Sequence, residues 1–229
     1  MKIAGLSALT KTEINLYGQK YTLAALDASE QEVFEDNFNK LLATTDSQVR
    51  RILEERVDTI VAGVMAIKEK LDRRKFHGMN PGDMEIGMGF IRPEFVKSNN
   101  VVRTDWNVTL TGMGTWDRWL DRAAGGGFVL SEDHGLIITH LVSQVSPTPF
   151  VRAVHMQIGR VNLIPEEVAD IILGDNLNQV PVFPIPTKFA LPEDELLATI
   201  TGEPGVEFIK LGGLVIGLGR LLKAETPAW

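Results

Sequence analysis

The chain has 229 residues, which is enough to bury a substantial core in one large domain or two small ones. Its net charge of −7 argues against a general nucleic-acid binder, because such proteins normally carry a basic surface. The absence of cysteine excludes disulfides, thiol catalysis and cysteine-ligated zinc, and the most apolar run, 211–222, is too short and too rich in glycine to cross a bilayer, which takes about 20 residues.

The N-terminal region is predicted to begin with a β-hairpin followed by a helix. Apolar and polar residues alternate over 13–26 around a turn at 17–19. Ser29 and Glu32 fit a capping box that starts a helix over about 30–43. The apolar face of this helix would comprise Val33, Phe34, Phe38, Leu41 and Leu42.

A second and longer helix is predicted over about 46–75, after a capping pattern of Thr45 with Gln48. Its apolar residues recur every three or four positions, close to the seam of a coiled coil. This helix seam consists of Val49, Leu53, Val57, Ile60, Val64, Ile67 and Leu71. Two interpretations stay open: the seam packs on the protein's own sheet, or it packs against a neighbouring subunit. Gly63 would permit a close approach in either case.

The segment 77–100 is rich in glycine, proline and asparagine, which is typical of a loop or an extended arm. We expect it to end an N-terminal region, 1–100, that holds the hairpin and the two helices. The remaining residues, 101–229, would form a β-rich body.

Short strands are predicted throughout the body. In the strand over 101–111, Trp106, Val108 and Leu110 face one way and polar residues face the other. The prolines of 180–186 cannot lie inside a helix, so that segment is expected to be an edge strand. Further strands are expected at 128–130, 136–145, 150–161, 196–201 and 206–220, turns at 191–194 and 202–205, and short helices at 115–124 and 165–173.

Glycines at 212, 213, 217 and 219 fall inside the last predicted strand. In a helix each would cost about 1 kcal/mol relative to alanine, whereas in a sheet glycine marks a bulge or the close approach of another group. The body shows no regular alternation of strands with helices. We therefore expect a mainly β, α+β fold with an N-terminal helical arm and a jelly-roll or β-sandwich body.

The sequence contains no recognisable catalytic motif. The segment 131–134 (SEDH), followed by His140, comes nearest to a metal cluster, and in a strand His134 and His140 would lie on one face. The closely spaced histidine pair of a metal-binding cupin is missing, and a cupin-like site would have to use His134, His140 and His155. The glycines of 112–115 and 217–220 complete neither a phosphate loop nor a dinucleotide fingerprint. We predict no catalytic residue, no bound metal and no cofactor.

Tryptophan is the more informative residue type. Trp116 and Trp119 would stack on sugar rings or anchor a partner if they were exposed. The last residue, Trp229, has no reason to remain in water, so we assign it with the helix seam to an assembly interface.

Four stretches of the body resemble the jelly-roll domains of viral capsid and other virion structural proteins: 140–159 (HLVSQVSPTPFVRAVHMQIG), 180–186 (VPVFPIP), 191–200 (LPEDELLATI) and 209–219 (IKLGGLVIGLG). This resemblance implies a non-enzymatic structural subunit that self-assembles into a capsid or similar protein shell. Its partners would be copies of itself and other shell proteins. It would be located in the virion after synthesis in the host cytoplasm. We expect no signal peptide, because the residues after the first few are polar.

Nucleic acid would be a partner only through a local basic face formed by Arg50, Arg51, Arg73, Arg74 and Lys75. Two alternative functions remain. The first is a carbohydrate-binding or adhesin-like β-sandwich that uses Trp116 and Trp119. The second is a cupin-like metalloenzyme that uses the three histidines of the body.

Overall fold

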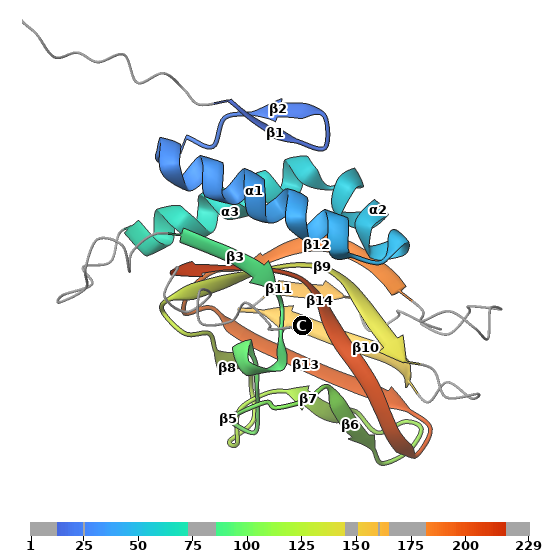
Figure 1. Ribbon diagram of the computed structural model, residues 1–229. Coiled ribbons are helices and arrows are strands. Elements are labelled where there is room, and N and C mark those ends of the chain that lie inside the picture. The colour runs from blue at the N-terminus through green and yellow to red at the C-terminus, as the bar shows by residue number, and fades with distance from the viewer. Residues whose placement is uncertain are drawn as a thin grey trace, which may run out of the picture.

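Two antiparallel sheets face each other, and a layer of helices covers one of them (Figure 1). The computed structural model describes residues 13–24, 26–72, 86–144, 151–159, 161–164 and 182–218. Strands hold more of the described residues than helices do, so the expectation of a mainly β, α+β fold is confirmed. Within these ranges no helix combines the length and the apolar character that a membrane crossing requires.

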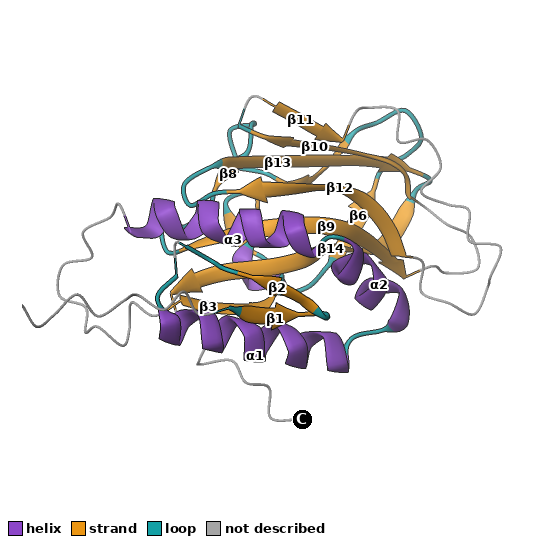
Figure 2. Cartoon of the chain, turned by 90° about the horizontal axis from the view of Figure 1, so that it is seen from above, coloured by secondary structure: helices purple, strands orange, loops and turns teal. Residues whose placement is uncertain are grey.

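The helical layer contains three α-helices. They are α1 (Ala28–Thr44), α2 (Ser47–Glu55) and α3 (Val57–Asp72). A small hairpin lies beside α1, formed by β1 (Ile14–Leu16) and β2 (Gln19–Tyr21). Figure 2 shows α2 and α3 over the strands and α1 next to β3. The predicted hairpin and first helix are confirmed.

We call the covered sheet the helix-side sheet. Its strand order is β12 (Val182–Ala190), β9 (His134–Gln144), β14 (Gly205–Leu218) and then, end to end along the same side of β14, β3 (Ile86–Phe90) and β6 (Asn107–Leu110). As predicted, the proline-rich strand β12 lies at an edge, where the missing N–H groups of proline cost no ladder bonds.

We call the second sheet the outer sheet. Its order is β11 (Val161–Ile164), β10 (Val151–Ile158), β13 (Glu195–Gly202) and then, again along one side of the last strand, β7 (Asp117–Leu120) and β8 (Phe128–Val129). Two short elements follow β3: the 3₁₀ turn η2 (Pro93–Phe95) and the hairpin of β4 (Lys97–Ser98) and β5 (Val101–Val102). All strand pairs in both sheets are antiparallel.

Strand β14 has apolar side chains in both cores of the molecule. Leu211 and Val215 belong to the core between the sheets, whereas Leu214 and Ile216 belong to the core between the sheet and the helices. A strand buried on both faces needs a continuous apolar run. That requirement explains the sequence of this strand, in which apolar residues do not alternate with polar ones.

The glycines of β14 act as the sequence predicts. A Cβ atom at Gly212 would overlap the imidazole ring of His140 on the neighbouring strand. The pairing of β14 with β9 also shifts by one residue beside Gly213, because Thr139 is an extra residue in β9. Gly63 on α3 likewise allows a close approach, since a Cβ there would lie 2.7 Å from the ring of Phe189.

The helical region differs from the prediction at its boundaries. The single helix over 46–75 is wrong: α2 ends at Glu55, and α3 starts at Val57. Between them Arg56 leaves the helical conformation, and its guanidinium donates to the carbonyl of Thr139, 2.7 Å away. A long-range contact therefore accompanies the break.

The helix caps also differ. Asp27, not Ser29, caps α1 and forms the capping box with Glu30. Asp46, not Thr45, accepts the N–H of Gln48 at the start of α2. Aspartate is at least as good a capping residue as serine or threonine, so the sequence offered two neighbouring candidates in each case.

Two further predictions are wrong. The helix expected at 115–124 is strand β7, which pairs with β13 and buries Trp119 and Leu120. Part of the loop or arm expected at 77–100 is strand β3, an integral strand of the helix-side sheet. The expected helix at 165–173 and residues 77–85 lie outside the described residues.

Candidate assembly surface

The helix seam packs inside the chain rather than on its surface. Six of its seven residues are buried, and Val49 is partly buried against the same cluster. Their neighbours include Ile137 and Leu214 of the helix-side sheet. The geometry therefore favours the first of the two interpretations, in which the seam packs on the protein's own sheet. Trp229 lies outside the described residues.

Other apolar side chains are exposed on the body, away from the helices. Of the eight large apolar residues that are exposed in the described chain, six lie on strands and loops away from the helices. We call these six the distal surface: Val101, Val102, Met113, Trp116, Val129 and Val206. They come from β5, β8, the start of β14 and the loop between β6 and β7, in the lower part of Figure 1.

The loop between β6 and β7 is held in place by local hydrogen bonds. The carboxylate of Asp117 accepts the backbone N–H of Thr111 at 2.7 Å and its hydroxyl at 2.8 Å. The same loop meets the turn between β13 and β14, where a Cβ at Gly112 would lie 3.9 Å from Pro204. A fixed loop therefore presents Met113, 69% exposed, near Val206, 65% exposed.

The hairpin of β4 and β5 carries the two exposed valines of β5. Its turn residues, Asn99 and Asn100, have positive φ angles, which asparagine tolerates better than most residues. The buried carboxylate of Asp121 accepts the backbone N–H of Asn99 at 2.6 Å. This bond ties the hairpin to the end of β7.

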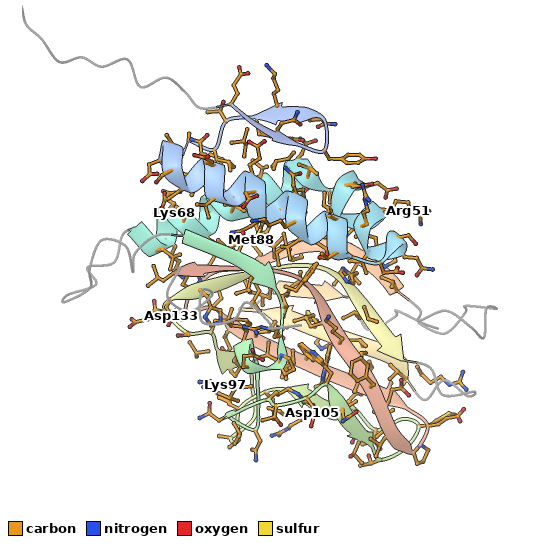
Figure 3. All side chains as sticks on the ribbon, viewed as in Figure 1. Arg51, Lys68, Met88, Lys97, Asp105 and Asp133 are labelled. Carbon is orange, nitrogen blue, oxygen red and sulfur yellow. The ribbon has the colours of Figure 1, made fainter. Side chains whose placement is uncertain are left out.

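Charges around the distal surface are balanced. Four arginines pair with four acidic residues there: Arg103 with Asp105, Arg118 with Asp121, Arg122 with Glu195, and Arg152 with Glu203. Figure 3 shows Asp105 at this end and Arg51 and Lys68 in the helical layer. These four pairs therefore add no net charge to this end.

Arg103 is the most constrained of these charges. Its guanidinium donates to the backbone oxygens of Asp105 and Trp119, both at 3.0 Å. Burial lowers its pKa, against the opposing effect of the Asp105 charge. A buried guanidinium bonded to carbonyls stiffens the segment between β5 and β6.

The two tryptophans that were candidates for stacking on a ligand differ in exposure. Trp119 is fully buried between the sheets, with its ring 6.4 Å from that of Trp106, so it cannot stack on a ligand. Trp116 is 41% exposed, and its ring meets the edge of His155 at 6.3 Å. The spacing of three residues predicted a shared helical face, whereas the strand places the two rings in different surroundings.

The three histidines lie in three different layers. His134 faces the core between the sheets, 5.1 Å from Phe95, and its Nδ1 donates to the carboxylate of Asp133 at 2.9 Å. The extra residue in β9 turns His140 to the helix side, and His155 lies on the outer face of β10. Their even spacing would place His134 and His140 on one face of a regular strand, and the extra residue places them on opposite faces. In the part of the chain that the structure describes, no three His, Asp or Glu side chains group to hold a metal ion.

The described part of the basic face is paired within its own helix. Arg50 bonds Glu54 at 2.7 Å, and Arg51 lies 3.7 Å from Glu55. Residues 73–75 of that face lie outside the described residues. The two arginines of α2 thus belong to a solvated face of mixed charge.

Comparisons with known proteins leave the function open. No family model matches the chain, no curated protein matches it, and no solved structure matches its fold.

Proposed function

We propose that the protein is a non-enzymatic structural subunit that self-assembles into a viral capsid or similar protein shell. The observation that carries the proposal is the distal surface. Apolar side chains lie exposed there on a fixed loop and a hairpin, at the end of the body that the described helices leave uncovered. Contiguous exposed apolar patches mark surfaces that other proteins cover, and we assign such a contact to Met113 and Val206 on their two neighbouring turns.

We also propose that the body is a jelly roll with eight strand positions, in which β3 and β6 share one position and β7 and β8 share another. The strand order supports it: β14 pairs with β3 and β6, β13 with β7 and β8, β9 with β12, and β10 with β11. Strands early in the chain thus pair with strands late in the chain, in nested order, and successive pairs alternate between the sheets. Jelly rolls occur in viral capsid domains, lectins and cupins. By analogy of fold, we therefore consider these three classes of protein as candidates for the function.

Among these three classes, the surface favours the shell subunit. A cupin needs histidines that converge on one ion, and here the three histidines of the body face three layers. The partner we propose is a second copy of this chain. Because the distal surface is bordered by both signs of charge, two identical copies would meet there without the repulsion that the net charge of −7 would otherwise cause.

Light scattering and electron microscopy of the pure protein test this proposal. We expect discrete large particles, and we expect the double variant Met113→Asp, Val206→Asp to shift the protein towards monomers. A charge placed on an apolar contact must be desolvated without a partner, which disfavours association. The matched control is Val33→Asp, which changes an exposed apolar residue of α1. A monodisperse monomer at high concentration, or equal assembly of all three proteins, would contradict the proposal.

A second candidate function rests on Trp116. Its exposed ring lies on the outer face of the outer sheet beside His155, an arrangement that suits stacking on a sugar ring. A glycan array compares the protein with the variant Trp116→Ala. Signal from particular sugars that disappears in the variant would favour a carbohydrate-binding sandwich, and its absence would remove this candidate.

A further inference from the structure

Three basic side chains from three separate elements, two of them cationic and one a neutral imidazole, lie on the helix side of the helix-side sheet. We call them the cationic cluster: Arg56 from the break between α2 and α3, His140 from β9 and Lys210 from β14. These residues are at least 70 positions apart in the sequence, so only the fold brings them together. None of them belongs to the distal surface.

Arg56 is fixed across two strands. Its Nη1 donates to the carbonyl of Thr139 at 2.7 Å and to the carbonyl of Ile185, and it lies 3.3 Å from the hydroxyl of Thr187. Its Nε and Nη2 atoms have no partner among the described residues. The guanidinium is therefore held by one nitrogen, while its other donors stay available.

The pairing of β9 with β14 places His140 beside Lys210. His140 is opposite Gly212 and Lys210 is opposite Val142, so the two side chains are diagonal neighbours on one face. Such neighbours lie roughly 7–8 Å apart at their Cα atoms, within reach of a lysine side chain. The Thr139 hydroxyl, 2.8 Å from Nδ1 of His140, can donate to that nitrogen and leave Nε2 as an N–H donor.

The charge of Glu55 acts on Arg56, but within the described residues no ion pair neutralises the cationic cluster. In the described residues no carboxylate lies within ion-pair distance of Lys210, and burial lowers the pKa of this ammonium. Burial, together with the charges of Lys210 and Arg56, lowers the pKa of His140 to about 4. On α2, Glu54 and Glu55 pair with Arg50 and Arg51.

Partly buried cations without a counter-ion are costly, because burial removes their hydration and nothing replaces it. A guanidinium fork, an ammonium and an imidazole N–H together form the donor set that binds tetrahedral oxyanions. We propose that the cationic cluster binds a phosphate group. The site does not depend on self-assembly, since it lies under the helical layer.

Titration of the full-length protein with inorganic phosphate, at an ionic strength held constant with sodium chloride, tests the proposal. We expect saturable binding by calorimetry that Lys210→Gln weakens about tenfold or more, because it removes a charged hydrogen bond. Lys210→Arg should keep most of the affinity. The matched control is Lys188→Gln: Lys188 is opposite Ile138 and so lies on the other face of the same sheet, and its loss should leave the affinity unchanged.

A nucleoside monophosphate serves as a second probe. If free phosphate binds more tightly, the ligand of the site is the phosphate ion. If the nucleotide binds more tightly, the ligand is a phosphate group carried by a larger molecule. If Lys210→Gln does not fold, NMR of the unmodified protein provides the test. We expect the ring resonances of His140 to shift saturably as phosphate is added. An unchanged His140 spectrum, no saturable binding, or equal affinity in Lys210→Gln would overturn the proposal.

Discussion

The two sheets of this molecule differ in how many of their faces are covered. The helix-side sheet is covered on both faces, by the helices and by the outer sheet, whereas the described residues cover only one face of the outer sheet. In β13 of the outer sheet, buried residues alternate with partly exposed ones along the whole strand. In β14 the last eight residues are all buried. The residue pattern of a strand thus reports how many layers contact it.

The largest expected loss of stability comes from truncating a side chain of β14, the strand that is buried on both faces. Leu214→Ala removes a fully buried side chain from the core beneath the helices, and we expect the free energy of unfolding to fall by about 2–5 kcal/mol. Leu197→Ala, on the partly exposed face of β13, should cost about 1 kcal/mol. Urea unfolding monitored by tryptophan fluorescence measures both. Equal losses would show that the helices add little burial.

The second effect is a pH dependence that belongs to the helix-side sheet. The pKa of His140 is about 4 in the folded protein, against an ordinary value of 6.5, chiefly because the ring is buried. Between these values the unfolded chain binds a proton that the folded chain does not. The free energy of unfolding should therefore fall as the pH decreases from 6.5 to 4, by about 3 kcal/mol in total.

The variant His140→Gln isolates this contribution, because other groups titrate in both proteins. We expect the difference between the two stability curves, measured by urea unfolding in chloride buffers, to level off above pH 6.5 and below pH 4. A difference that does not change between these limits would show that His140 is solvated in the folded protein.

The smallest effect on stability is expected at the distal surface. Val206→Ser changes a side chain that is 65% exposed, so the free energy of unfolding of the monomer should change by no more than about 0.5 kcal/mol. Thermal unfolding at low protein concentration measures this change. A large loss would indicate that Val206 packs within the monomer and is not available to a partner.

The sequence predicted most strands because their boundaries are local. Prolines and glycines at 191–194 and 202–205 mark the turns around β13, and the prolines of β12 exclude a helix there. A helix was predicted in place of strand β7 because Trp116 and Trp119, three positions apart, would lie on one face of a helix. The same residues are equally compatible with a strand. Only the pairing with β13 decides between the two.

The features that sequence reasoning missed depend on contacts distant in the chain. The helix break at Arg56 coincides with carbonyls more than 80 positions later, and no local pattern marks it. The cationic cluster is invisible for the same reason. Exposure on the distal surface was also beyond reach, because valine and methionine are more often buried than exposed.

Strand β14 also has a consequence for how the protein is made. Its partners β3, β6 and β9 all precede it, so during synthesis they leave the ribosome before the strand that joins them exists. The helix-side sheet can close only after residue 218 has been translated. Until then the nascent chain exposes unpaired strand edges, which invite premature association and make this body a substrate for chaperones.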